Sequence, residues 1–440
     1  MDARATREAT QGAARAGRQT RGRLSRLIPL ALAAGVAWGC AGQAAGADFV
    51  RSQATPAPGT AVAASEAAAA VDAFGFDLLH SAAAGNAVLS PASIALALSM
   101  ARAGAVGETA AQMDKVLHDL YSTGGGSGVA SFCRALNGLS GTFTDAYGSR
   151  QTVEVRVANA TFAQRNLAFV QAYLDTLASG FDAGQRLADF AADPEAARKS
   201  INVWVSDQTG GRIPELLSSL DTATRLVLVN AIYMKAAWQN PFIVESTSDT
   251  AFTRLDGTQV QVPTMHQMLE PGLYASGSGW QAVELPYGDG SLAMDIIVPT
   301  DLVAFEARLD GTTWGQIVSA LKNATVDLSL TRFKTGSKMQ LAESLAALGM
   351  PLAFDPDKAD FSGMTTQEKL YISAVVHQAN ISVDEKGTEA SAATAAVMAG
   401  TAMPVDVVTL KVDRPFLFAV RDTRSGGVIF VGRIVDPSAN

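Results

Sequence analysis

The spacing of hydrophobic positions changes along the chain and separates a mainly helical first half from a strand-rich second half. Up to about residue 210, apolar residues recur mostly at helical spacing, and one alternating segment, residues 153–163, predicts a strand. The segment Ile94–Met100 is apolar nearly all round, which predicts a helix buried in a core. Ser90 can cap that helix, and Pro91 suits its first turn. Helices are expected at residues 69–83, 91–103, 109–120, 167–179 and 194–208.

The second half reads mainly as strands. Residues 225–234 form a run rich in Val, Leu and Ile without helical period, which predicts a strand buried on both faces. Helices at 302–309 and 338–347 are expected to interrupt the strands. Helices first and sheets later indicate an α+β fold. Further strands are expected at residues 259–267, 280–286, 293–298, 326–333, 370–383, 407–412, 416–421 and 429–434.

Length and composition bound the domain organisation. The chain has 440 residues, 48% of them hydrophobic, which is enough for a large core. Length alone suggests two or three domains. No Pro/Gly/Ser-rich linker divides the sequence after residue 70, so we expect a single domain over residues 69–440.

The N-terminus has the pattern of an export signal. Residues 1–47 contain basic residues followed by a short apolar run from Leu27 to Trp38, which is too short for a comfortable membrane span. Ala45-Gly46-Ala47 is an acceptable cleavage site, and Cys40 offers a second route, lipid attachment. We therefore expect an exported protein, extracellular or periplasmic, with a membrane-anchored lipoprotein as the alternative. Residues 48–68, rich in Ala and containing Thr, Pro and Gln, predict a disordered tether.

Charge and motif content argue against several function classes. The net charge is −8, and removal of residues 1–47 would make it about −13, so neither nucleic acid nor a heparin-like polyanion is an expected partner. The four His residues lack metal-ligand spacing, and no Cys cluster is present, so no metal or cofactor is expected. Neither a Gly-x-Ser-x-Gly elbow nor a phosphate loop occurs, so we do not expect an enzyme.

One stretch stands out from the rest. Residues 384–396 combine a charged start, Gly387 and a long run of very small residues, and they follow a predicted strand. A surface loop this long is often functional. Small side chains on a segment with strand potential suit a loop that enters a sheet already walled by packed residues, because interiors have little free volume.

This stretch resembles the hinge of the serpins, serine protease inhibitors that insert their own reactive loop. Other segments resemble serpin signatures in the same order, from about residue 69 to residue 437. The resemblance implies the serpin fold, with about nine helices around three β-sheets and an exposed reactive-centre loop, here in an exported bacterial member. The matching segments are 86–94, 104–113, 201–217, 229–242, 284–287, 361–364, 414–416 and 432–433.

The resemblance also assigns roles to residues of this sequence. Glu385 is expected to pair with a basic group on a neighbouring strand, for which the resemblance points to Arg332, with Lys334 as the second option. A buried polar group beneath the central sheet is expected to gate its opening, since buried polar atoms need partners. The implied hinge residues are Glu385, Gly387, Thr388, Ala390, Ala392 and Thr394. The implied residues around the opening of the sheet are Ser90, Ser93, Asn230, Trp238, Arg332 and His377.

The implied activity is suicide inhibition of a serine protease. The target protease is the expected partner, and the inhibitor is expected to be a monomer. Counting from the hinge places the reactive bond at Thr401–Ala402, with Met398 and Met403 nearby and the register open by a few positions. The window lacks Arg, Lys and Asp, which favours elastase-, subtilisin- or chymotrypsin-like targets. A non-inhibitory serpin acting as a binding or chaperone-like protein is the alternative.

Overall fold

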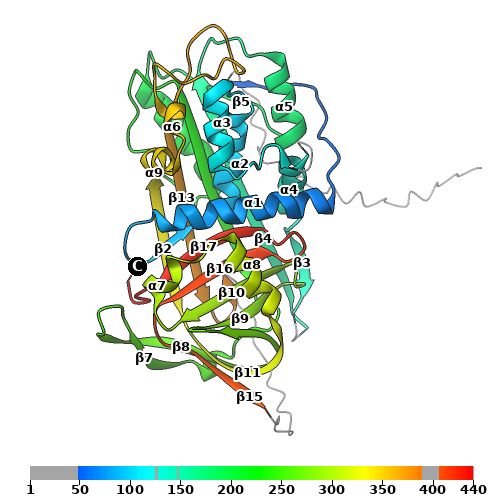
Figure 1. Cartoon of the computed structure of the whole chain (residues 1–440), viewed down its shortest axis with the longest axis vertical. Coiled ribbons are helices and arrows are strands. Elements are labelled where there is room, and N and C mark those ends of the chain that lie inside the picture. Colours follow the sequence, from blue (N-terminus) through cyan, green and yellow to red (C-terminus); the bar gives the residue numbers. More distant parts are fainter. Residues whose placement is uncertain (1–47, 124–126, 146–147, 389–405, 440) are drawn as a thin grey trace, which may run out of the picture. The chain divides into compact units, whose positions relative to one another are not determined.

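Two β-sheets and the helices packed against them make up the part of the chain that the computed structural model describes, namely residues 48–123, 127–145, 148–388 and 406–439 (Figure 1). The first sheet has the strand order β1-β5-β4-β6-β14-β13-β12, with β3 paired to β4. Its strands are β1 (Phe49–Val50), β3 (Gly141–Thr144), β4 (Arg150–Gln164), β5 (Gln185–Ala188), β6 (Leu226–Ala237), β12 (Phe333–Gln340), β13 (Ile372–Asp384) and β14 (Gly387–Thr388).

The second sheet has the order β15-β11-β8-β9-β10-β16-β17-β2, with β7 paired to β8. The long strand β8 pairs with β7 and β11 and, near its end, with β9, so hydrogen bonding joins into one sheet what the resemblance divides into two. Its strands are β2 (Ala87–Leu89), β7 (Ser248–Thr253), β8 (Gln259–Gly277), β9 (Trp280–Tyr287), β10 (Leu292–Pro299), β11 (Lys322–Thr331), β15 (Val407–Val412), β16 (Phe416–Asp422) and β17 (Val428–Ile434).

Nine α-helices lie within the described residues, and the α+β class expected from the sequence is confirmed. Short 3-10 turns also occur at Val244–Ser246 and Pro351–Phe354. The helices are α1 (Ala61–His80), α2 (Pro91–Arg102), α3 (Gly107–Val116), α4 (Gly128–Asn137), α5 (Gln171–Phe181), α6 (Pro194–Gln208), α7 (Leu302–Glu306), α8 (Gly311–Ala320) and α9 (Ala342–Leu348).

Helix α2 is buried along nearly its whole length, as its apolar sequence predicts. Ser90 accepts a hydrogen bond from the Ser93 N–H at 3.2 Å, and Pro91 occupies the first turn. Because the helix packs against β4, β6 and β17, it lies beneath the first sheet and presents Ser90 and Ser93 to its strands. The capping predicted from the sequence therefore also places two hydroxyl groups against the central strands.

The prediction of a disordered tether over residues 48–68 is wrong. Phe49–Val50 is a strand on the edge of the first sheet, and α1 already begins at Ala61, where the Thr60 side chain accepts the Ala63 N–H at 3.1 Å. Small residues in this segment suited a helix packed on the core, because Ala63, Ala64, Ala67 and Ala68 are all buried.

Two further differences concern elements of the second half. The helix expected at 338–347 is divided, since β12 extends to Gln340 and α9 begins only at Ala342. Helix α8 was not predicted, although Asp310 caps it by accepting the Thr313 N–H at 2.7 Å.

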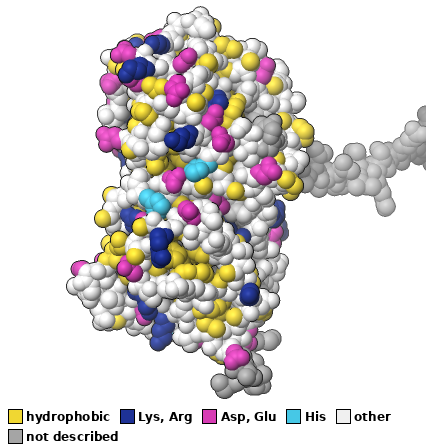
Figure 2. Space-filling model, in the orientation of Figure 1, with side chains coloured by type: hydrophobic (Ala, Val, Ile, Leu, Met, Phe, Trp, Pro, Cys, Tyr) yellow, Lys and Arg dark blue, Asp and Glu magenta, His cyan; other side chains and the backbone are white. Residues whose placement is uncertain are grey.

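The surface carries both signs of charge. In Figure 2, Lys and Arg side chains are interspersed with Asp and Glu on the face shown.

Candidate functional site: the seam between β6 and β13

The central feature of the first sheet is the seam between β6 and β13, where two parallel strands pair directly along only part of their length. Direct pairing extends to Ile232 on β6 and Ala379 on β13. Further along the same strands, β14 lies between them. Thr388 is paired with Ala236 on one side and Val383 on the other, so two residues of the predicted hinge already belong to the sheet.

Gly387 is required at this position for two reasons. Its φ of 136° lies in the region that favours glycine. A Cβ atom would collide with the Ala236 carbonyl oxygen and would lie 2.8 Å from the Ala237 Cα. The chain therefore enters the seam through a gap that only glycine fits.

Thr388 is buried in the seam with 1% of its surface exposed. Its Oγ1 forms a 2.7 Å hydrogen bond with the hydroxyl of Tyr287, a residue of β9 that the sequence reasoning did not place in the site. The Tyr287 ring stacks on Trp238 at a centroid distance of 4.1 Å. Burial raises the pKa of the Tyr287 hydroxyl, so this group stays protonated and available for the hydrogen bond.

Trp238 fixes the turn that leads into β14. Its backbone N–H donates to the Lys386 carbonyl at 2.9 Å, and its indole Nε1–H donates to the Asp384 carbonyl at 2.9 Å. The ring is 1% exposed. Trp238 thus hydrogen-bonds to both ends of the turn between β13 and β14. The other role of its ring is to stack against Tyr287.

Glu385 at the tip of this turn is buried but remains ionised. Of the two candidate partners, Arg332 forms the ion pair, with Nε 2.8 Å from the carboxylate, and Thr247 donates a further hydrogen bond at 2.5 Å. Burial alone would raise the pKa of Glu385, but the hydrogen bonds from Arg332 and Thr247 together lower it. The predicted pairing of Glu385 is therefore made by a side chain from the loop between β11 and β12.

A network of fully buried polar side chains crosses the seam where β6 and β13 pair directly. His377 on β13 bonds through Nδ1 to the Asn230 side-chain oxygen and through Nε2 to the Ser90 N–H, at 3.1 Å. Asn230 on β6 donates to the Asn159 side-chain oxygen at 2.6 Å and also to Ser93. Ser90, Ser93, Asn230 and His377, which the sequence reasoning grouped together, are thus in contact.

Asn159 on β4 completes the network and was missed by the sequence reasoning. Its side-chain oxygen also accepts the Ser93 hydroxyl at 2.9 Å, and its amide donates to the Ser93 carbonyl at 3.0 Å. It lies directly opposite Asn230 in the register of β4 and β6. An Asn within a predicted strand was the one available signal, but only the register connects it to the site.

The hydrogen bonds define the state of His377. Since Nε2 accepts the Ser90 N–H, the proton of the neutral ring is on Nδ1, where it is donated to Asn230. Burial lowers the pKa of His377 to about 3. The network is therefore neutral at physiological pH and holds β13 to β6 and α2 through hydrogen bonds alone.

Several predicted site residues lie outside the described residues. They are Cys40, Ala390, Ala392, Thr394, Met398, Thr401, Ala402 and Met403. Within the described ranges, no group of three or more His, Cys, Asp or Glu side chains is arranged to hold a metal ion. No helix in those ranges is both long and apolar enough to cross a membrane.

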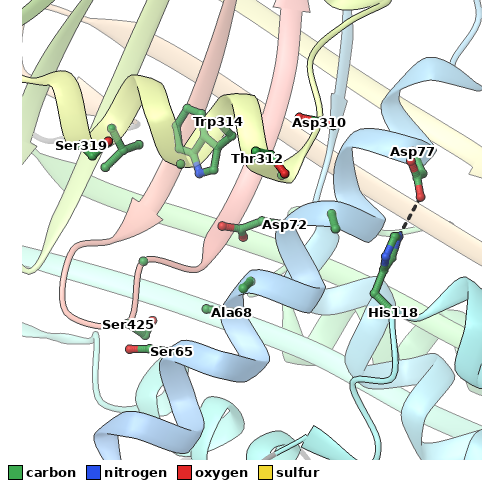
Figure 3. Close-up of a pocket in the computed structure, with 16 residues that line it drawn as sticks. Ser65, Ala68, Asp72, Asp77, His118, Asp310, Thr312, Trp314, Ser319 and Ser425 are labelled. Atoms are coloured by element: carbon green, nitrogen blue, oxygen red, sulfur yellow. Dashed lines mark hydrogen bonds and ion pairs between the residues drawn. The ribbon is translucent and has the colours of Figure 1, made fainter.

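A separate cavity of about 750 Å³ lies between α1 and α8, next to the turn that joins β16 and β17 (Figure 3). Asp72 lines it, and burial raises the pKa of this carboxyl to about 7 even though Oδ1 accepts the Val428 N–H at 2.7 Å. At one end Asp77 contacts His118 at 2.8 Å. The cavity is not part of the seam.

Three features define this site: the strand β14 between β6 and β13, the ion pair of Glu385 with Arg332, and the buried polar network around His377. Comparison with known proteins identifies the class to which they belong. The profile of the serpin (serine protease inhibitor) family matches residues 69–437. Leukocyte elastase inhibitor of Bos taurus is 38% identical over 371 residues, covering 80% of this chain and 94% of the relative. A serpin-like protein of Thermococcus kodakarensis is 36% identical, covering 84% and 85%.

Solved structures agree. The thermophilic serpin tengpin in its native state superposes with a TM-score of 0.75 at 26% identity, covering 88% of this chain and all of that one. Thyroxine-binding globulin in complex with thyroxine gives a TM-score of 0.70 at 26% identity, covering 86% and 100%. The chain therefore belongs to the serpin family.

Proposed function

We propose that this protein is an irreversible suicide-substrate inhibitor of serine proteases rather than an enzyme. The observation that carries the proposal is β14, since Gly387 and Thr388 lie between β6 and β13 in positions that a longer inserted strand would continue. The residues that follow Thr388 are mostly small, which is what insertion between packed strands requires. Relatives named leukocyte elastase inhibitor support the same activity.

The proposed mechanism uses the chemistry of the target. The protease serine attacks the carbonyl of the reactive bond, expels the amine of the following residue and forms an ester with the loop. The freed end of the loop then inserts into the seam and distorts the protease before water hydrolyses the ester. A strand of roughly 15 residues spans about 50 Å. On the order of ten new ladder hydrogen bonds at about 1 kcal/mol each would supply roughly 10 kcal/mol.

The proposal extends to target class and location. Thr401–Ala402 is the proposed reactive bond, and its small residues suit elastase- or subtilisin-like pockets, while Met398 or Met403 would suit a chymotrypsin-like one. The basic and apolar pattern of residues 1–47 supports an exported bacterial protein, with Cys40 as the site of a lipid anchor in the alternative route. We propose a monomer whose partner is the target protease.

The test is incubation of the purified protein with a panel of elastase-, subtilisin- and chymotrypsin-like proteases, followed by denaturing gel electrophoresis and mass analysis. We expect a complex that survives boiling in detergent and a peptide released from the C-terminal side of the reactive bond. The mass of that peptide fixes the bond. Degradation of the loop by every protease, without a stable complex, would refute inhibition.

A second candidate is a non-inhibitory role as a binding protein. The cavity between α1 and α8 favours it, because about 750 Å³ is in the size range of small-molecule sites. One structural relative is thyroxine-binding globulin with its ligand. A binding protein of this kind would form no stable complex with any protease of the panel, and the same gel experiment therefore separates the two candidates.

A further inference from the structure

Another cavity lies over the strand pair β12 and β13 at the edge of the first sheet and is here called the β12–β13 pocket. Its volume is about 330 Å³, which is within the size range of small-ligand sites. Lys334, Gly336 and Lys338 of β12 line it together with Gln378 and Asn380 of β13. None of its lining residues is acidic, although the whole sequence carries a net charge of −8.

The register of the two strands explains why these side chains converge. Residues two apart on a strand point to the same face, so Lys334, Gly336 and Lys338 share one face of β12. Asn380 lies directly opposite Gly336, and Gln378 lies directly opposite Lys338. The two lysines are about 13 Å apart along the strand, with the glycine midway between them. Because lysine stems are flexible, both ammonium groups can reach a ligand held above the glycine.

The missing side chain at Gly336 shapes the floor of the pocket. A Cβ atom at this position would collide with Oδ1 of Asn380, so the carboxamide of Asn380 lies directly over the glycine. Any other residue at position 336 would push that carboxamide aside. Position 336 therefore allows the floor to be disturbed without changing any of the polar side chains that line the pocket.

The protein satisfies the polar groups of the pocket only in part. Oε1 of Gln378 is buried and has no hydrogen-bond partner among the described residues. Rotating this carboxamide by half a turn directs its N–H donors inward instead. Lys338 Nζ donates to the Glu215 carbonyl at 3.3 Å, which leaves two of its three N–H donors for other partners. The Glu215 carboxylate is paired with Arg198 at 3.0 Å, so it does not neutralise the lysines.

A simpler role exists for the two lysines alone. Charged side chains on an edge strand discourage pairing with a second chain, and both Lys334 and Lys338 are exposed on such a strand. That role requires neither a glycine between the lysines nor two carboxamides opposite them. Asn is also disfavoured in strands, so Asn380 over Gly336 calls for a further explanation.

We propose that the β12–β13 pocket binds a small multivalent anion with oxygen acceptors, either a phosphate compound or a polycarboxylate. Lys334 and Lys338 supply the positive charge, and the amides of Gln378 and Asn380 donate hydrogen bonds to the oxygens of the anion. Both strands lie on the same side of the seam between β6 and β13. Binding therefore needs no insertion of the reactive loop, and it goes beyond the proposed function.

The test is calorimetric titration of the full-length protein with pyrophosphate and with citrate, at an ionic strength held constant with sodium chloride. We expect saturable binding of one anion per protein. Lys334→Gln removes a charged donor and Gly336→Ala displaces the Asn380 carboxamide, and each should weaken binding about tenfold. The matched control Lys322→Gln removes an exposed lysine of β11 and should bind normally. The anion that binds more tightly identifies the ligand as phosphate or carboxylate.

The location of the site is checked by nuclear magnetic resonance, in which the side-chain amide signals of Gln378 and Asn380 should shift as the anion is added. Equal weakening by Lys334→Gln and Lys322→Gln would show general attraction to surface charge and would overturn the pocket. Absence of saturable heat with both anions would overturn it as well. If Gly336→Ala does not fold, Lys334→Gln still decides, because position 334 is exposed. Failure of the pocket leaves protease inhibition untouched, since the gel experiment measures that separately.

Discussion

The two parts of the seam between β6 and β13 are held in different ways. At the end where β14 lies between the two strands, here called the open end, the contacts are made by the entering chain itself. They join Thr388 to Tyr287 and Glu385 to Arg332. In the middle, the contacts cross directly from β13 to β6, through His377 and Asn230. In the proposed insertion the strand lengthens, which keeps the first set of contacts and breaks the second.

The difference gives a reason for the polar network among the apolar side chains in the middle of the seam. Apolar side chains across a seam resist separation by the full cost of exposing their surface, and they do not depend on a particular partner. Hydrogen-bonding groups such as Asn230 and His377 can instead bond again to the backbone of an entering strand. A buried polar network thus keeps the closed seam specific without making its opening prohibitively costly.

Cleavage of the loop should have the largest effect on the seam. Insertion would lengthen the part that β14 occupies and shorten the part where β6 and β13 pair directly. A single cut near Thr401 by a non-target protease should let the loop insert and raise the unfolding midpoint by about 10 °C. A gain of roughly 10 kcal/mol at about 1 °C per kcal/mol, for a domain of this size, accounts for that shift. Thermal unfolding before and after a cut verified by mass measures it. A cleaved form no more stable than the intact one contradicts loop insertion.

A charge at the open end should come next in size. Thr388→Arg places a cation where the threonine is now 1% exposed, and burying it without a partner costs several kcal/mol. The hinge should leave the seam, insertion should slow, and the variant should become a substrate that the protease cleaves and releases. The stoichiometry of inhibition measures this. Val303→Arg, at an exposed position of α7, is the matched control and should inhibit normally.

Acid should weaken the closed part of the seam. The unfolded chain protonates His377 near pH 6.5, whereas in the fold its pKa is about 3, so stability falls as pH drops through this window. The loss should be about 2 kcal/mol between pH 7 and pH 5, measured by chemical unfolding at each pH. His377→Gln lacks this contribution and should show a shallower pH dependence. An unchanged slope would mean that His377 is not buried as a neutral ring.

The smallest effect should come from one hydroxyl at the open end. Tyr287→Phe leaves the Thr388 hydroxyl buried without its partner, which should lower stability by about 1 kcal/mol, measured by chemical unfolding. Thr388→Val in the same background removes both partners and should restore most of the loss. Tyr274→Phe, a half-buried tyrosine of β8, is the control for loss of a hydroxyl. A double variant worse than the single one would exclude the Tyr287–Thr388 coupling.

Local patterns predicted most elements well, and α6 began and ended at the expected residues because Asp193, Pro194 and the helical spacing all agree there. The errors arose where long-range pairing decides the structure. Phe49 and Val50 are too short a run to read as a strand, and only pairing with β5 orders them. The polar end of β12 reads as helical, but its pairing with β13 makes it a strand.

The site was predictable as a set of residue types and less so as a set of contacts. Gly387, Thr388 and Glu385 could be identified from their order along the chain. Asn159 and Tyr287 could not, because each reaches the seam from a strand whose register is fixed by the rest of the sheet. The resemblance pointed to Arg332 as the partner of Glu385, and the fold confirms that ion pair.

The presence of β14 between β6 and β13 changes the kinetic problem that the proposed inhibitor has to solve. Starting a strand in the middle of a sheet fixes many dihedral angles before any ladder bond repays the lost entropy, as the start of a helix does. In this protein that first step is complete before any protease arrives, since Gly387 and Thr388 are already paired on both sides. In the proposed mechanism, insertion after cleavage would therefore begin as elongation from an existing nucleus. It would compete with hydrolysis of the ester without an initial lag.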